Sequence, residues 1–372
     1  MTTKVGEKKY YSKRIKGRVV YFGNVAKVTR AEAERAYLRK LESLESGTEE
    51  ASPNAATLAD LYNQFFYEQK KKHANGEIVY RTLKDYESAV KLLSKTTPLT
   101  TRLEKLNATH FKRMRDKIIL TNAGKKRSPV AANAILGNCR TIFKFASRDN
   151  FLIDRPLPCE SAFRKISAKV VRKHRARQAP RLLEPEEITQ LIDLADINYK
   201  PVFWLAINGG YNNSDLKNLT LNNLGGLNEG VIDYAREKTG IRRTTPLWPE
   251  TVEALSKWLA QRPDVEHDFV FVSLQRGPRF GTPLLGDEER KCRLSSTMER
   301  YCKKLGSDGP GKNFGAFRST FADVGTQVAD DATVKACMGH LDGSVLYTNY
   351  ARQKYIPKLK KVTDHVREWL LA

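Results

Sequence analysis

The sequence lacks the features of a membrane protein or of a secreted one. No stretch of its 372 residues approaches the run of about 18 apolar residues that a transmembrane helix requires. The first residues also lack the apolar core of a secretory signal. The five cysteines are scattered and form no Cys-x-x-Cys pair, which argues against a disulfide framework and against a zinc site. We therefore expect a cytoplasmic protein that has no membrane partner.

Acidic residues are scarce relative to basic ones. The chain has 65 Lys and Arg against 42 Asp and Glu, which gives a net charge of +23. Such an excess predicts a polyanionic partner. The hydrophobic fraction of 40%, with 15 Tyr and 15 Phe, is typical of a folded protein and not of a disordered one.

Two stretches of low hydrophobicity, Glu45–Ala56 and Pro156–Pro180, divide the chain. They predict a small module of residues 1–50, a helical domain of residues 56–155, a basic linker of residues 156–180 and a mixed domain of residues 181–372. The expected fold class is mainly α with small β-sheets (α+β).

The first module contains two β-prone runs, Lys8–Ile15 and Arg18–Gly23, on either side of a short turn with a glycine. A helix from about Arg30 to Leu44 follows. Basic residues interleaved with aromatic ones on a sheet suit a DNA groove. We expect DNA contacts from Lys13, Arg14 and Arg18, and a merely solvated hairpin is the alternative.

The second segment shows three apolar stripes at helical spacing, which begin at Leu58, Leu83 and Ile135, and a further helix around Thr109–Leu120. Basic residues lie between the stripes and continue into the linker. Charge runs often mark only a solvated face, but runs of one sign favour phosphate contacts. The predicted contacts are Lys71, Lys112, Arg113, Lys126, Arg127, Arg172, Lys173 and Arg175.

The third segment reads as mixed α/β. A helix is expected after Pro185, a buried helix over Val202–Ile207, and a last helix over Tyr355–Leu371. Val231–Ala235 and Arg243–Leu247 are expected to pair as strands around a turn that contains Lys238.

Four motifs in this segment occur in a distinctive order. They are Lys238-Thr239-Gly240 followed by an Arg-x-x-Pro-Leu-x-Pro pattern, Asn313–Phe321 around Arg318, Ala336–His340, and Leu346–Ala351 with two tyrosines. In this order they resemble the catalytic domain of the tyrosine recombinases, the phage-integrase-like DNA strand transferases. The whole chain also resembles the family's architecture of an arm-type DNA-binding module, a helical core-binding domain and a catalytic domain.

The resemblance implies a site-specific recombinase that cuts and rejoins DNA through a 3′-phosphotyrosine, with no metal and no other cofactor. It makes Lys238 the general acid, Arg318 the phosphate clamp, His340 a donor to the phosphate and Tyr350 the nucleophile, with Tyr347 as the alternative. The implied partners are double-stranded DNA and further copies of the chain, as a tetramer on DNA. The last helix would dock on a neighbouring protomer, or it packs within its own chain.

Two positions depart from the family pattern. Asn212 stands where the first arginine belongs, and Gly315 stands where a histidine precedes the second arginine. Arg242 and Arg243, which complete the predicted DNA-binding set, or Lys217 would have to supply the missing charge. A catalytically degenerate recombinase fold that only binds DNA is therefore the alternative function, and a type IB topoisomerase-like activity is a third.

Overall fold

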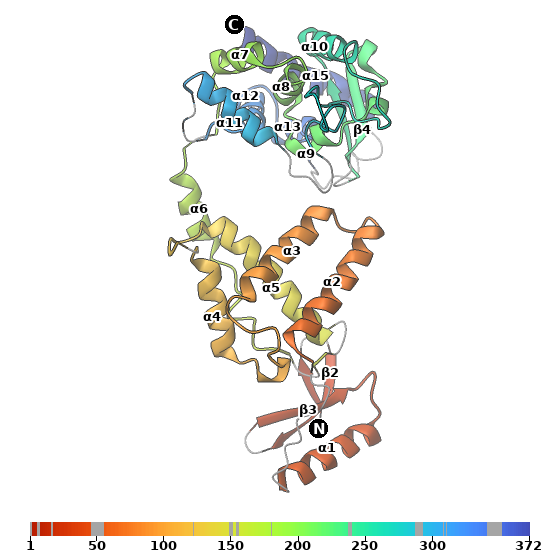
Figure 1. Ribbon diagram of the computed structural model, residues 1–372, viewed down its shortest axis with the longest axis vertical. Coiled ribbons are helices and arrows are strands. Elements are labelled where there is room, and N and C mark those ends of the chain that lie inside the picture. The colour runs from red at the N-terminus through yellow and green to blue at the C-terminus, as the bar shows by residue number, and fades with distance from the viewer. Residues whose placement is uncertain are drawn as a thin grey trace. The chain divides into compact units, whose positions relative to one another are not determined.

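The structure is a computed structural model that describes residues 2–5, 8–15, 18–45, 56–121, 123–148, 152–153, 156–179, 181–236, 240–286, 293–307, 309, 311–340 and 352–372. The chain forms two compact units, Met1–Arg177 and Gln178–Ala372, and Figure 1 labels most of their elements. The predicted α+β class is confirmed, because helices dominate and the strands form only a three-stranded and a two-stranded sheet in the described residues.

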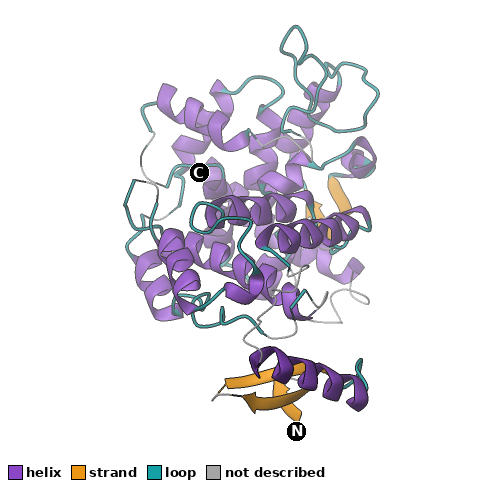
Figure 2. Ribbon diagram, turned by 60° about the horizontal axis from the view of Figure 1, so that its bottom comes forward, coloured by secondary structure: helices purple, strands orange, loops and turns teal. Residues whose placement is uncertain are grey.

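The N-terminal module is a three-stranded antiparallel sheet of β1 (Thr2–Val5), β2 (Lys8–Ile15) and β3 (Arg18–Asn24), followed by α1 (Arg30–Glu45). Figure 2 shows α1 lying beside the strands. The β2–β3 hairpin was predicted, but β1 was not, because four residues are too few for an alternating pattern to stand out. An edge-to-face contact between Phe22 and Tyr37, 5.5 Å between ring centroids, joins the sheet to α1.

The helical domain consists of α2 (Leu58–Ala74), α3 (Tyr80–Leu93), α4 (Ala108–Ile119) and α5 (Pro129–Arg148). Helices α2, α3 and α4 all contact α5. A capping box between Thr57 and Asp60 starts α2. The apolar stripes that predicted these helices supply the buried core of the domain.

The beginning of the predicted linker is part of this core. Leu157, Cys159 and Phe163 are buried in it, and the ring of Phe163 stacks on Phe143 at a centroid distance of 5.5 Å. The following helix, α6 (Ala168–Ala176), has no buried residue. The sequence did not reveal the boundary, because three apolar residues at irregular spacing among prolines and arginines show no period.

The C-terminal unit is built around α8 (Lys200–Gly209), which lies in its middle (Figure 1) and is apolar on nearly all sides. Its neighbours are α7 (Pro185–Leu194), α10 (Pro249–Leu259), α12 (Gly315–Gly325) and α15 (Arg352–Leu371). Further α-helices in the described part of this unit are α9 (Asn213–Lys217), α11 (Leu294–Lys304) and α13 (Asp331–Cys337).

A two-stranded antiparallel sheet completes this unit. It pairs β4 (Val231–Ala235) with β5 (Arg242–Pro246), and its register runs from Val231 opposite Pro246 to Ala235 opposite Arg242. The second strand thus begins and ends one residue earlier than predicted.

The last helix packs within its own chain. Leu359, Val362 and Val366 are buried in the core of the C-terminal unit, and Trp248 donates its indole N–H to the Thr363 carbonyl at 2.9 Å. Of the two roles that the apolar stripe of this helix left open, the structure therefore shows the intramolecular one.

Within the described residues, no helix is long and apolar enough to cross a membrane. The four cysteines described, Cys139, Cys159, Cys302 and Cys337, are buried and form no disulfide. No group of three or more His, Cys, Asp or Glu residues in the described parts of the chain is placed to hold a metal ion.

Candidate active site

A single buried carboxylate, that of Asp215 on α9, gathers three arginines in the C-terminal unit. The Arg236 Nη2 lies 2.7 Å from Oδ1, the Arg243 Nη1 lies 2.9 Å from Oδ2, and the Arg318 Nη1 lies 3.6 Å from Oδ2. Arg236 directly follows β4, Arg243 lies in β5 and Arg318 lies in α12. We call Asp215, Arg236, Arg243 and Arg318 the arginine cluster.

Backbone carbonyls and His340 fix the Arg318 guanidinium. Its Nη1 donates to the Gly210 carbonyl at 2.5 Å, and its Nη2 donates to the Met338 carbonyl at 2.9 Å and to the His340 Nε2 at 2.5 Å. Gly210 follows α8 in the left-handed region (φ 64°), where a Cβ would also lie 2.9 Å from the Phe321 ring. A glycine is therefore required to bring this carbonyl to the arginine.

Arg236, which directly follows β4, is held in a similar way. Its Nε donates to the Asp215 Oδ1 at 2.8 Å, and its Nη1 donates to the Gly339 carbonyl at 2.5 Å. Gly339 has a φ of 65°, and a Cβ there would lie 2.6 Å from the Arg236 Cδ. Arg236 was not among the predicted site residues, although it stands only two positions before Lys238, the first residue of the hairpin motif.

Arg243 is a structural member of the cluster. Its side chain is fully buried, its Nη2 donates to the Gly209 carbonyl, and its guanidinium lies 3.5 Å from the centre of the Tyr211 ring. Its assignment to the DNA-binding surface is therefore corrected, since no atom of its side chain reaches solvent. Arg242, on the opposite face of β5, is exposed and forms an ion pair with Asp233 at 2.6 Å.

The cluster carries more positive than negative charge. Three guanidiniums face one carboxylate, which leaves an excess of two positive charges in a largely buried place. Burial, followed by the neighbouring Arg243, lowers the pKa of Arg318 to about 10. Burying unbalanced cations is costly, so an anion that binds beside them is favoured. A phosphate oxygen suits a guanidinium in both charge and geometry.

The Asn212 side chain brings no charge to the arginine cluster. It is the N-cap of α9, where its side-chain oxygen accepts from the backbone N–H groups of Ser214 and Asp215 at 2.8 and 3.0 Å. The Asp215 Oδ2 accepts the Asn212 N–H in return at 3.2 Å, which completes a capping box. Asn212 therefore helps to orient the carboxylate that holds the arginines.

Gly315, the other departure, is the first residue of α12 and is exposed. Its N–H donates to the Asn313 Oδ1 at 3.0 Å. It brings no side-chain donor to the site.

The contact with Arg318 defines the protonation state of His340. A guanidinium has only donors, so the His340 Nε2 must accept, and the proton of the neutral ring is on Nδ1. Burial and then the charge of Arg318 lower the pKa of His340 below its ordinary value of 6.5. The histidine is therefore neutral at pH 7 and can donate from Nδ1.

We expect the Cε1–H resonance of His340, identified by its absence in His340→Gln, to titrate in NMR spectra with a midpoint below 6.5. Because the unfolded chain takes up this proton at a higher pH than the folded chain, the contribution of neutral His340 to stability is present above pH 6.5. It is lost as the pH falls through the lowered pKa. A midpoint at or above 6.5 would contradict the Arg318–His340 contact.

Of the four predicted catalytic residues, the structure describes two, Arg318 and His340, and it brings these two together. Arg318 and His340 are in direct contact. Lys238, Tyr347 and Tyr350 lie outside the described residues. Gly240 donates its N–H to the Arg236 carbonyl at 2.7 Å, and Lys238 stands two positions after Arg236 in the sequence. The segment with both tyrosines follows directly after His340.

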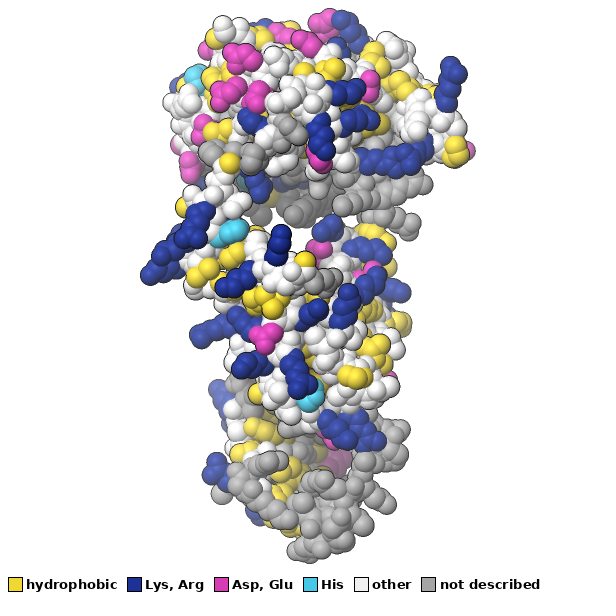
Figure 3. Space-filling view, turned by 60° about the vertical axis from the view of Figure 1, so that its left-hand side comes forward, with side chains coloured by type: hydrophobic (Ala, Val, Ile, Leu, Met, Phe, Trp, Pro, Cys, Tyr) yellow, Lys and Arg dark blue, Asp and Glu magenta, His cyan; other side chains and the backbone are white. Residues whose placement is uncertain are grey.

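Most of the predicted DNA-binding side chains lie on the surface. Figure 3 shows Lys and Arg predominating over Asp and Glu on the visible face of the helical domain. Arg127 is half-buried and donates its Nε–H to the Ile118 carbonyl at 2.9 Å, and the side chain of Arg18 lies outside the described residues. The exposed members of the set are Lys13, Arg14, Lys71, Lys112, Arg113, Lys126, Arg172, Lys173, Arg175 and Arg242.

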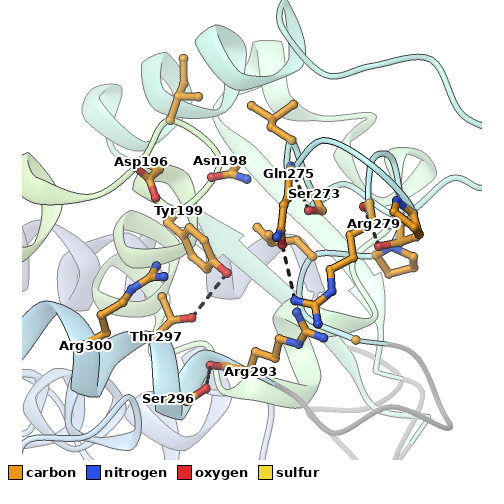
Figure 4. A pocket seen from close by; sticks show the side chains of 17 residues that line it. Asp196, Asn198, Tyr199, Ser273, Gln275, Arg279, Arg293, Ser296, Thr297 and Arg300 are labelled. Carbon is orange, nitrogen blue, oxygen red and sulfur yellow. Dashed lines mark hydrogen bonds between the residues drawn. The ribbon is translucent and has the colours of Figure 1, made fainter.

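A separate hollow of about 1080 Å³ lies between α11, the turn before α8 and the loop around Ser273. Figure 4 shows Arg279, Arg293 and Arg300 at its edges, with Arg279 donating to the Gln275 Oε1 at 3.4 Å. None of the described residues of the arginine cluster lines it. The C-terminal unit therefore has a second basic surface besides the cluster.

A family profile described as "Phage integrase family" matches residues 181–355, the part of the chain that contains the arginine cluster, His340 and both tyrosines. This segment belongs to the phage integrase family. The resemblance to tyrosine recombinases, a family of DNA strand transferases, is thereby confirmed. The comparison with curated proteins gave no match.

Solved integrase structures share the fold. A lambda integrase dimer bound to a COC′ core site aligns with a TM-score of 0.58 at 17% identity, covering 95% of this chain and 93% of that one. A lambda integrase tetramer bound to a Holliday junction aligns with a TM-score of 0.57 at 17% identity, covering 90% and 94%. The Tn1549 transposon integrase in complex with transposon right end DNA gives 0.55 at 15% identity, covering 82% and 99%.

Proposed function

We propose that this phage integrase family member is a site-specific DNA recombinase that cuts and rejoins DNA through a 3′-phosphotyrosine. One observation carries the proposal: Arg318 and His340 are in contact beside a buried carboxylate that holds two further arginines. An excess of buried positive charge suits the phosphorane-like transition state of phosphoryl transfer, whose negative charge must be stabilised by fixed donors.

In the proposed reaction the Tyr350 oxygen attacks a backbone phosphorus. A bond forms between this oxygen and phosphorus, the bond from phosphorus to the 5′ oxygen breaks, and the phenol proton is released to water. Lys238 gives a proton to the leaving 5′ oxygen, while Arg318 and the Nδ1–H of His340 bind the non-bridging oxygens. Attack of a 5′-hydroxyl on the phosphotyrosine reverses these steps, so rejoining needs no external energy source.

Double-stranded DNA is the proposed substrate. The net charge of +23 and the exposed basic side chains of the helical domain support it. Similar integrases are seen as a dimer on a core site and as a tetramer on a Holliday junction. We propose the same tetrameric assembly on DNA, with residues 1–50 as an arm-type module and residues 56–155 as a core-binding domain.

The test is to trap the covalent intermediate. The full chain is incubated in EDTA with a pool of short random-sequence duplexes that carry a nick, so that the cleaved 5′ fragment diffuses away and the adduct accumulates. We expect a protein–DNA adduct on denaturing gels that is lost in Tyr350→Phe and kept in Tyr347→Phe. Sequencing the trapped DNA then gives the preferred site.

An adduct that persists in Tyr350→Phe and disappears in Tyr347→Phe would overturn the assignment of the nucleophile. The second candidate function, a DNA-binding module without catalysis, is favoured by Asn212 and Gly315, which bring no charge to the site. It predicts salt-sensitive DNA binding with no adduct from the unaltered chain.

A further inference from the structure

The three arginines of the cluster differ in how far a ligand can reach them. The side chain of Arg243 is 0% exposed, that of Arg236 is 7% exposed and that of Arg318 is 14% exposed. Arg243 is also stacked on the fully buried Tyr211. Only Arg236 and Arg318 therefore keep an opening through which an anion could meet them.

Arg236 and Arg318 are held in matching ways. Arg318 donates to the carbonyl of Met338, and Arg236 donates to the carbonyl of the next residue, Gly339. Both pair with Asp215, Arg236 at Oδ1 and Arg318 on the side of Oδ2. The two guanidiniums therefore flank one short turn, and the residue that follows this turn is His340.

The Arg236 guanidinium also keeps donors for a ligand. Each of its three nitrogens makes a contact, Nε and Nη2 with Asp215 and Nη1 with Gly339. A guanidinium has five N–H groups, so each terminal nitrogen retains one beyond these contacts. Two such groups on neighbouring nitrogens match the spacing of two phosphate oxygens.

The other candidates for the missing charge are placed less well. Arg242 lies on the opposite face of β5 and is engaged by Asp233 through both Nε and Nη2. The Arg243 side chain is fully buried. Lys217, the last residue of α9, forms no ion pair with the Asp215 carboxylate in the described residues.

We infer that Arg236 is a second phosphate-binding guanidinium of this active site, and that it supplies the positive charge that Asn212 does not bring. The inference rests on the proposed function, and its ligand is a phosphodiester of the DNA backbone. Gly339 fits this role, because any side chain there would displace Arg236 from its place. The charge lost at position 212 is thus regained from the hairpin that also carries Lys238.

The first test needs no catalysis. Inorganic phosphate is titrated into the full chain while the Nε–H resonances of the arginines are followed by NMR, with assignments from Arg236→Lys and Arg318→Lys. We expect the Arg236 and Arg318 resonances to shift together with one dissociation constant. Movement of Arg318 without Arg236 would overturn the inference, whether or not the protein cleaves DNA.

The second test measures single-turnover cleavage of the duplexes trapped by the unaltered chain, at saturating protein. We expect Arg236→Gln to lower the rate by about 10- to 100-fold. Arg236→Lys should lose less, because it keeps the charge but not the two-pronged geometry. The matched control is Arg367→Gln, which removes an arginine paired with Glu250 at 2.5 Å elsewhere in the unit, and its rate should stay within about twofold.

A purely structural role for Arg236 predicts a different result. In that case Arg236→Gln would lower the midpoint of thermal unfolding, but the folded fraction would cleave at the original rate and bind phosphate unchanged. This outcome would overturn the inference. If the unaltered chain forms no adduct, the proposed function fails, and the phosphate titration alone still decides the role of Arg236.

Discussion

Replacing Arg318 with alanine is expected to lower the rate of DNA cleavage by about a thousandfold or more. An arginine that stabilises the charge of a phosphoryl-transfer transition state contributes this much in other enzymes. Here the Gly210 and Met338 carbonyls and His340 fix the guanidinium before any substrate arrives. Preorganised donors of this kind act without a reorganisation cost during the reaction. The measurement is single-turnover formation of the adduct at saturating protein.

The control for this experiment is Arg367→Ala. Arg367 lies on α15 and pairs with Glu250 on α10, and neither residue belongs to the arginine cluster. DNA affinity is measured in parallel, since Arg318 is one of many basic residues and its loss should weaken binding only modestly. A rate loss below tenfold in Arg318→Ala would contradict its role as the phosphate clamp.

Replacing Asp215 with asparagine is expected to destabilise the fold strongly. The change leaves the guanidiniums of Arg236, Arg243 and Arg318 without their shared anion, while keeping the size of the side chain. Removing one partner of a buried ion pair typically costs about 3–5 kcal/mol, because a buried charge is left uncompensated. Urea unfolding, followed by circular dichroism, should show this loss as a lower midpoint with an unchanged slope.

The matched control is Asp233→Asn. Asp233 forms a comparable contact with Arg242 at 2.6 Å, but this pair is exposed on the hairpin. Pairs of that kind contribute about 0–1 kcal/mol, because water screens them. Similar losses in the two variants would show that the arginine cluster does not depend on its central carboxylate.

Much of the fold was predictable because local patterns specify local burial. The stripes that begin at Leu58, Leu83 and Ile135 predicted α2, α3 and α5, and the apolar run at Val202 predicted α8. Such patterns repeat within a few residues and need no knowledge of the partner surface. The strand β1 and the folded start of the linker were missed, since neither is long or regular enough to show a period.

The sequence by itself revealed the resemblance of residues 181–355 to the phage integrase family, because short motifs around Arg318 and His340 retain their order and spacing. Only the tertiary structure decided the organisation of the arginine cluster. Arg236 lies 21 residues from Asp215 and 103 from Gly339 along the chain, yet it contacts both. Its neighbour Arg243 is fully buried, although it looked like a surface residue in the sequence. The spacing of charged residues along a sequence does not show which residues they pair with. Which arginines remain accessible to an anion is therefore fixed only by how α9, the β4–β5 hairpin and the turn after α13 pack together.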